Sequence, residues 1–236
     1  MRPPVSRARA LRTVLIGWLG SALAVAAAAQ VAPGSEQSAA YSGLFAAAQR
    51  GDGAALATAL AAKADVGARD PQGRTPLHVA TFARQREAIR ALVRAGADLG
   101  AMENDRYDAV TIAAVADDEE TLRVLLSLGA SAKLVTSRYD GTALIAAAHL
   151  GHDGVVRQLI AAGAPLDHVN NLHWTALIEA VVLGDGGSRH VATLRALLAA
   201  GANPQLTDRE GRTPLQLARS RGYAEMVRWL EQAGAK

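Results

Sequence analysis

The stretch DPQGRTPLHVA at residues 70–80 returns as DREGRTPLQLA at residues 208–218, so one pattern, D-x-x-G-R-T-P-L-x-x-A, occurs twice in the chain. Each copy places a threonine directly before a proline. A threonine oxygen can accept a hydrogen bond from the first turn of a helix, and proline suits the first helical position because its missing N–H needs no partner there. The pattern therefore predicts helices that begin at Pro76 and Pro214.

Related elements lie between these two copies. GTALIAA begins at Gly141 and WTALIEA begins at Trp174. With Ala109 as the equivalent in a degenerate copy, the threonine position recurs at 75, 109, 142, 175 and 213, at spacings of 34, 33, 33 and 38. A closing Gly-Ala pair recurs at Gly96, Gly129, Gly163, Gly201 and Gly234. A period near 33 residues predicts a repeat protein.

Each repeat carries two apolar stripes at helical spacing. Leu77 and Ala80 lie on one face of the first helix, and Ile89, Leu92 and Val93 form a stripe on the second. The closing glycine suits the left-handed position that ends a helix. One pair of short amphipathic helices cannot bury both stripes alone, so the pairs are expected to stack into an all-α solenoid.

With these motifs the chain resembles the ankyrin-repeat family over about residues 41–236. The resemblance implies an ankyrin-repeat solenoid of about six helix-turn-helix units with β-turn or hairpin connections. It also implies that the ring of His78 hydrogen-bonds the hairpin backbone. The expected units span residues 41–69, 70–103, 104–136, 137–169, 170–207 and 208–236.

The N-terminus has the three parts of a secretory signal peptide. A basic start precedes the apolar run Thr13–Ala29, which ends in the small residues that signal peptidase prefers. We expect residues 1–29 to be cleaved after Ala29, so that the chain meets the membrane only transiently and is periplasmic or secreted. A retained membrane anchor is the alternative. Residues 30–40 are expected to be a flexible lead-in.

The positive charge of the chain is concentrated in this leader. The formal net charge is +3, and removal of the four arginines among residues 1–12 leaves 21 basic residues against 22 acidic ones. A phosphate polymer requires a strong positive field, so nucleic acid is not an expected partner. The chain has no cysteine, which excludes disulfides and thiolate chemistry.

The candidate catalytic groups form no recognisable constellation. His149 and His152 could share a helix face, but no third ligand stands at a spacing that completes a zinc site. Ser188 and His190 are too close in sequence to hold a nucleophile and its base in geometry. We therefore predict no catalytic residue, no metal and no cofactor, with an enzyme site in the 184–190 segment as the alternative.

Two segments depart from the repeat. The acidic run at residues 117–120 is interpreted as a helix start, which carboxylates stabilise through the helix dipole, or as part of a binding surface. The Gly-rich residues 184–190 lengthen the fifth unit, and insertions in repeat arrays often lie on the binding face. The sequence leaves both alternatives open.

The family resemblance implies a concave binding face made of hairpin tips and the ends of the first helices. The function expected is a monomeric, non-catalytic scaffold that binds another protein outside the cytoplasm, with stress tolerance or neutralisation of a toxic partner as narrower alternatives. Tyrosine, tryptophan and arginine are enriched at binding hot spots. The residues predicted to contact the partner are Arg74, Arg106, Arg138, Tyr139, His149, Leu150, Asn171, Leu172, Trp174, Leu183, Arg209 and Arg212.

Overall fold

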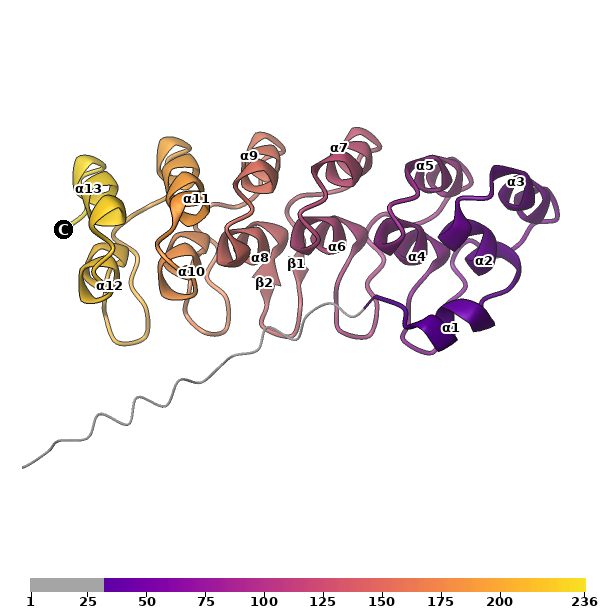
Figure 1. Cartoon of the computed structure of the whole chain (residues 1–236), viewed down its shortest axis with the longest axis horizontal. Coiled ribbons are helices and arrows are strands. Elements are labelled where there is room, and N and C mark those ends of the chain that lie inside the picture. The colour runs from indigo at the N-terminus through magenta and orange to yellow at the C-terminus, as the bar shows by residue number, and fades with distance from the viewer. Residues whose placement is uncertain (1–31) are drawn as a thin grey trace, which may run out of the picture.

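The computed structural model describes residues 32–236 as one row of helix pairs, with a short helix at its N-terminal end (Figure 1). The predicted signal peptide lies outside the described residues. The helices are α1 Ser35–Ala40, α2 Gly43–Arg50, α3 Gly53–Ala61, α4 Pro76–Phe82, α5 Arg86–Arg94, α6 Ala109–Val115, α7 Glu119–Ser127, α8 Ala143–Leu150, α9 Asp153–Ala161, α10 Ala176–Val182, α11 Ser188–Ala199, α12 Pro214–Ser220 and α13 Ala224–Gln232. Two short antiparallel strands, β1 Val135–Thr136 and β2 Gly141–Thr142, precede α8.

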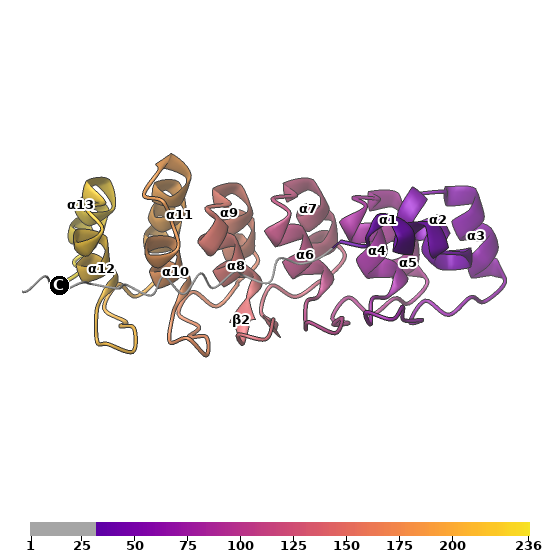
Figure 2. The same cartoon turned by 60° about the horizontal axis from the view of Figure 1, so that its bottom comes forward.

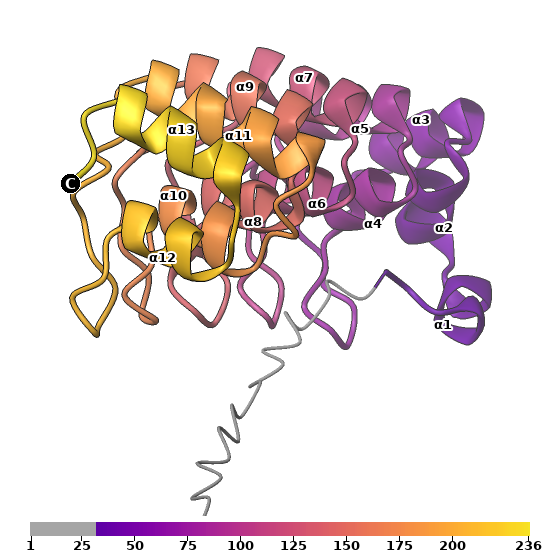
Figure 3. The ribbon, with the colours of Figure 1, turned by 60° about the vertical axis from the view of Figure 1, so that its left-hand side comes forward.

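The six helix pairs of the described residues form two layers. The first helices (α2, α4, α6, α8, α10 and α12) make one layer and the second helices (α3 to α13, odd numbers) make the other (Figure 3). The connections between pairs all extend from the same side of the stack, next to the first helices (Figure 2). We call the surface made by these connections and the first helices the hairpin face. The predicted all-α repeat solenoid is confirmed.

The helix starts follow from local hydrogen bonding. The hydroxyl of Thr75 accepts from the backbone N–H of His78, and that of Thr213 accepts from Gln216. The Nδ1 of His78 and the Oε1 of Gln216 accept in return from the N–H of the capping threonine, so both helices have a capping box. The predicted starts at Pro76 and Pro214 are confirmed.

In the degenerate third unit, an aspartate caps the first helix in place of the threonine. The repeat spacing placed Ala109 at the threonine position, but the cap of α6 is Asp108, whose Oδ1 accepts from the N–H of Thr111 at 2.8 Å. Aspartate caps a helix as well as threonine does, because its carboxylate oxygen reaches the same N–H. The capping residues therefore recur at spacings of 33, 34, 33 and 38 residues.

Small side chains allow the two layers to pack closely. The core is a continuous cluster that runs the length of the stack and is rich in alanine, with leucines such as Leu92, Leu125 and Leu159 fully buried. Alanine at the helix contacts lets neighbouring backbones approach, and each leucine then fills the space between adjacent pairs. His78 lies in this core, and its Nε2 is 3.2 Å from the carbonyl oxygen of Tyr107, as the family resemblance implies.

Residues 35–40 were expected to be part of a flexible lead-in, but they form helix α1. The helix is held by side chains of the second unit: the amide of Gln37 donates to Asp70 at 3.0 Å and accepts from Arg74 at 2.9 Å. Directly after α1, the hydroxyl of Tyr41 donates to Asp70 at 2.6 Å. These polar contacts attach α1 to the hairpin face, and the sequence pattern of a polar lead-in did not reveal them.

The insertion in the fifth unit extends α11 more than it lengthens a loop. α11 has 12 residues, whereas α5, α7, α9 and α13 each have 9. Its first turn holds Arg189, which pairs with Asp117 at 2.9 Å and with Asp153 at 3.5 Å. The same turn places His190 between Asp185, 2.8 Å away, and the carbonyl oxygen of His149. The longer helix therefore joins the third, fourth and fifth units.

The acidic run at 117–120 is divided between two roles. Asp118 caps α7 and pairs with Arg86 at 3.2 Å, and Asp117 binds Arg189 from the fifth unit. Glu119 and Glu120 are exposed at the start of the helix, where Glu119 accepts from the amide of Gln158 in the fourth unit at 3.2 Å and Glu120 pairs with Arg123. Three of the four carboxylates thus make contacts with other units, beyond the helix-dipole effect that the sequence suggested.

Candidate functional site

Four of the predicted contact residues line one small pocket on the hairpin face. Tyr139 comes from the β1–β2 hairpin, His149 from the end of α8, Leu172 from the connection before α10 and Leu183 from the end of α10. The pocket has a volume of about 70 Å³. Its remaining lining is formed by Thr136, Ser137, Gly141, Thr142, Ile145, Ala146, Asn170 and Glu179.

Hydrogen bonds between successive connections position the rim of this pocket. The backbone N–H of Asn171 donates to the carbonyl oxygen of Tyr139 at 3.0 Å, and its side-chain amide donates to the carbonyl oxygen of Arg138 at 3.1 Å. Within the next turn, Oδ1 of Asn170 accepts from the N–H groups of Leu172 and Trp174, each at 3.0 Å. The fourth and fifth connections are therefore tied together, and Tyr139 and Leu172 are held at a fixed separation.

A buried carboxylate lies at the inner end of the pocket. Glu179 is only 4% exposed, although it sits on the layer of helices that faces the connections. Its Oε1 accepts a hydrogen bond from the amide of Asn170 at 3.0 Å, but its Oε2 has no hydrogen-bond partner among the described residues. The nearest cationic candidate is Nδ1 of His149, at 3.5 Å. This distance exceeds the usual range for a hydrogen bond.

The electrostatics of the pocket follow from this burial. Loss of water raises the pKa of Glu179 to about 7, and the hydrogen bond from Asn170 opposes the rise only in part. Burial also lowers the pKa of His149, with a further contribution from the charges of His190 and His152. The imidazole is therefore neutral at pH 7 and supplies no positive charge to the ionised fraction of Glu179.

Glu179 and Asn170 were missed as site residues by the sequence reasoning. The sequence did contain a signal. Glu179 lies four residues after the capping residue of its helix, and the same position in the second, third, fourth and sixth units is apolar: Val79, Ile112, Ala146 and Leu217. A glutamate at a repeat position that is otherwise apolar marks a departure from the packing rule.

Arg74 does not belong to the exposed face. Its side chain is buried, lies 3.6 Å from Asp70, and stacks over the ring of Phe82 at 5.6 Å. The amide of Gln37 from α1 covers it from the other side. The prediction of Arg74 as a partner contact is corrected for this reason, because the sequence did not indicate that α1 would pack there.

The other predicted arginines are exposed but already paired, and three of them bridge neighbouring connections. Arg106 pairs with Asp140 at 2.8 Å, Arg138 pairs with Asp105, and Arg209 donates to the carbonyl oxygen of Asn171. Arg212 pairs with Asp208 at 2.7 Å and with Glu210 at 3.0 Å. Exposed pairs of this kind contribute little to stability, so the side chains remain able to exchange these partners for those of another molecule.

Leu150 is more exposed than the other apolar candidates, which include Trp174. Trp174 is half-buried and packs against the hydrophobic core. Leu150 is 38% exposed at the end of α8, next to His149. Tyr139, Leu172 and Leu183 line the pocket and are half-buried, and Leu150 is exposed beside the lining residue His149.

The residues 184–190, which hold the alternative enzyme site, make contacts with the fourth and sixth units. Both ring nitrogens of His190 are engaged, Nδ1 with Asp185 and Nε2 with the carbonyl oxygen of His149. Tyr223 donates to the carbonyl oxygen of Gly184, which fixes the segment against the sixth unit. Within residues 32–236, no three histidine, aspartate or glutamate side chains are grouped to hold a metal ion.

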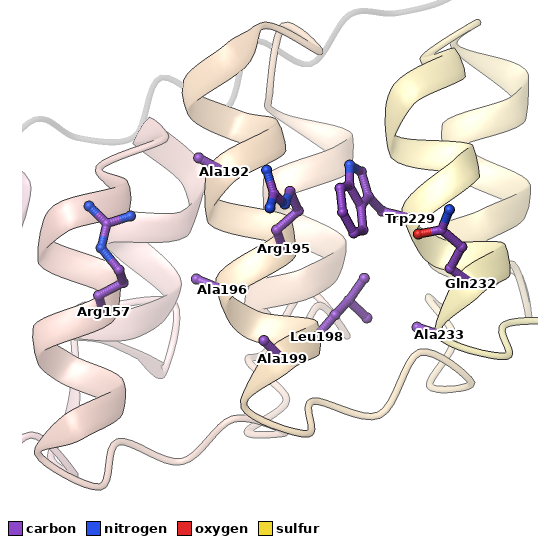
Figure 4. A pocket seen from close by; sticks show the side chains of 9 residues that line it. All are labelled: Arg157, Ala192, Arg195, Ala196, Leu198, Ala199, Trp229, Gln232 and Ala233. Carbon is purple, nitrogen blue, oxygen red and sulfur yellow. The ribbon is translucent and has the colours of Figure 1, made fainter.

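A second hollow lies on the opposite layer, between α11 and α13 (Figure 4). The guanidinium of Arg195 stacks 4.2 Å above the ring of Trp229, and the rest of the lining is mainly alanine. Figure 4 shows these two side chains pointing toward each other across the groove. The groove is wide and open, and it contains no buried polar group that would select a ligand, so we regard the pocket at Glu179 as the candidate site.

A solenoid of stacked helix pairs with a continuous connection surface is the architecture of a binding protein. The model of "Ankyrin repeats (3 copies)" matches residues 44–136 and 110–208, and that of "Ankyrin repeat" matches residues 210–236. The chain belongs to the ankyrin-repeat family.

Similar proteins are found among bacterial and eukaryotic ankyrin domains. The ankyrin repeat protein YahD of Escherichia coli (strain K12) is 43% identical over 100 residues, which cover 42% of this chain and 50% of that protein. An ankyrin repeat domain from Acinetobacter baumannii AYE is 47% identical, covers 82% of this chain and 98% of its own, and superimposes with a TM-score of 0.77. The ankyrin repeat domain of Bcl-3 is 27% identical, with a TM-score of 0.74, and covers 84% and 88% of the two chains.

The matched part of the chain spans half or less of the length of the curated relatives it matches. Among the helices of residues 32–236, none is both long enough and apolar enough to cross a membrane.

Proposed function

We propose that this chain is a non-catalytic scaffold that binds a partner protein on its hairpin face, with the contact centred on the pocket between the fourth and fifth units. Ankyrin repeats bind protein partners, and stacked repeats offer an extended surface for this purpose. The groups of residues 184–190 that could suggest catalysis are used to join units, which supports a binding role for the chain.

One observation carries this proposal. Tyr139, Leu172 and Leu183 come from three separate segments, yet they surround a single pocket whose inner end is a buried carboxylate without a full set of partners. Tyrosine is enriched at interface hot spots, which lie in well-packed, desolvated pockets. Packing of the repeat does not require a carboxylate here, because the positions equivalent to Glu179 carry Val79, Ile112, Ala146 and Leu217.

Capture of the partner tests the proposal. The mature protein is immobilised and exposed to an envelope extract of the source cells, in parallel with a variant that combines Tyr139→Ala and Leu172→Ala. We expect the double variant to lose the captured protein by at least tenfold. Arg123→Ala, on the exposed second-helix layer, is the matched control and should capture as the wild type does. Equal capture by the double variant and the wild type would show that the binding face is elsewhere.

The proposal includes export from the cytoplasm. It is supported by the basic start and the apolar run Thr13–Ala29 in the sequence. N-terminal sequencing of protein from fractionated cells should find Gln30 as the first residue, in the periplasm or the medium. A chain that keeps Met1 or Arg2 in the membrane fraction would instead be an anchored adaptor. The identity of the captured partner then decides between stress tolerance and neutralisation of a toxic protein.

A further inference from the structure

We infer that the pocket at Glu179 receives a primary ammonium group, the end of a lysine side chain of the partner protein, and that Glu179 is the residue that selects it. The inference rests on the proposed function, because it names the chemistry that a partner presents to the hairpin face.

The first argument is the incomplete environment of the carboxylate. An ionised carboxylate that is removed from water requires hydrogen bonds or an opposite charge. Asn170 satisfies Oε1, and Oε2 is left with neither. Since only 4% of Glu179 is exposed, water compensates little of this loss. A donor with a positive charge is the group that this oxygen lacks.

The second argument is that the protein does not supply that donor itself. His149 is the only described side chain with an ion-pair distance to Glu179, and its Nδ1 lies 3.5 Å away. Its Nδ1 faces Glu179 as a neutral group at pH 7, since burial and the neighbouring His190 and His152 disfavour the charged imidazole. A ligand cation would therefore meet a carboxylate that no internal cation neutralises.

The third argument is the shape and lining of the pocket. A volume of about 70 Å³ accommodates a few water-sized groups, which suits a slim chain of methylenes better than a broad, planar guanidinium. Ile145, Leu172 and Leu183 provide apolar walls for the methylenes. An ammonium carries three N–H donors, and the hydroxyl of Thr142 in the same lining, which already accepts from the N–H of Ile145, has a second lone pair for one of them.

A metal ion is a poorer occupant of the same space. Calcium and magnesium require several oxygen ligands, including more than one carboxylate in most protein sites. Glu179 is the only carboxylate in the lining, and no group of three metal-ligating side chains occurs in the part of the chain that the structure describes. The donor set thus fits one small organic cation.

Titration with n-butylammonium chloride tests the inference, because this ion has the carbon chain and charge of a lysine side chain. Two-dimensional NMR of the ¹⁵N-labelled mature protein follows the amides of Ile178, Glu179 and Leu183. We expect saturable shifts at these amides, with butyramide and n-propylguanidinium chloride each binding at least tenfold more weakly. Butyramide has a similar chain without the charge, and the guanidinium has the charge on a broader head.

Two variants assign the effect to the carboxylate. Glu179→Gln should weaken n-butylammonium binding at least tenfold, whereas Glu87→Gln, whose side chain is 87% exposed on α5, should leave it unchanged. Glu179→Gln keeps the shape of the side chain and removes a buried charge, so it is expected to fold.

Several outcomes would overturn the inference: equal binding of butyramide, tighter binding of the guanidinium, unchanged binding by Glu179→Gln, or shifts confined to other parts of the stack. None of these results affects partner capture through Tyr139 and Leu172, so the inference and the proposed function fail separately. Lysine-specific acetylation of a captured partner links the two, since it should release the partner from the wild type.

Discussion

Replacement of Glu179 by glutamine is expected to stabilise the fold, and to do so more at high pH than at low pH. The carboxylate is buried beneath the hairpin face, and its Oε2 has no hydrogen-bond partner among the described residues. Glutamine has the same shape, and its Oε1 can keep the hydrogen bond from Asn170. The substitution therefore removes the buried charge and leaves the packing intact.

The magnitude follows from the shift in pKa. The pKa of Glu179 is raised from 4.5 to about 7 in the folded state, so the folded protein binds a proton that the unfolded chain releases between these two values. The free energy of unfolding therefore falls as pH rises from 4.5 to 7, and it stays lowered above pH 7. At 1.36 kcal/mol per pKa unit, the full effect is about 3 kcal/mol.

Urea unfolding at pH 5 and pH 8, followed by circular dichroism, measures this effect. The advantage of Glu179→Gln over the wild type should be about 2–3 kcal/mol greater at pH 8 than at pH 5. Burial lowers the pKa of His149 near Glu179, but His149 is present in both proteins, so the comparison of the two proteins cancels most of its contribution. Glu87→Gln should differ little from the wild type at either pH. An equal advantage at both pH values would show that Glu179 is not a buried, uncompensated carboxylate, and would remove the basis of the ammonium site.

Three further predictions concern the scaffold. Burial lowers the pKa of His78 to about 4, so the contribution of this residue to the free energy of unfolding is full above pH 6.5 and is lost as pH falls toward 4. His78→Gln introduces the residue found as Gln216 at the equivalent cap. This variant should lose up to about 3 kcal/mol less unfolding free energy than the wild type between pH 7 and pH 4.5, as measured by urea unfolding. Gly184→Ala places a Cβ 2.1 Å from the carbonyl oxygen of Ala180 and should cost about 1–3 kcal/mol by thermal unfolding, while Gly53→Ala, in open space, should not destabilise. Asp108→Ala should cost about 0.5–2 kcal/mol, and Asp108→Asn less, as measured by hydrogen exchange in α6. A loss with asparagine as large as that with alanine would contradict the capping role.

The fold was predictable because its determinants are local. Thr75 and Pro76 form their helix start with residues three positions away, and a closing glycine such as Gly96, with a φ of 93°, ends its helix within one turn. Each unit repeats these short-range signals, so the stack follows from the period. The alignment placed Ala109 at the capping position of the third unit, where the structure has Asp108. The error arose because a carboxylate caps this helix, whereas a threonine hydroxyl caps the first helices of the second, fourth, fifth and sixth units.

The sequence predicted the face of the stack on which the candidate site lies, but it did not predict the pocket itself. The family resemblance selected Tyr139, His149, Leu172 and Leu183, and the structure brings these side chains to one pocket. Their roles as partner contacts stay predictions. The resemblance also selected Arg74, which α1 buries. Whether a hairpin residue is buried or exposed can depend on a segment outside the repeat, as it does for Arg74 and α1. The repeat pattern contains no information about such a segment.

The sequence by itself determined the repeat period, the helix starts and ends, and the six stacked pairs, because each of these depends on hydrogen bonds and apolar spacing within a few residues. Only the tertiary structure decided how Arg189 reaches Asp117, 72 residues earlier in the chain, and how α1 covers Arg74. It also decided that Glu179 lines the same pocket as Leu172, 3.5 Å from His149, with one oxygen that has no hydrogen-bond partner among the described residues. These features depend on groups that are distant in sequence and become neighbours only when the units stack, and burial then changes their charge and their capacity to bind.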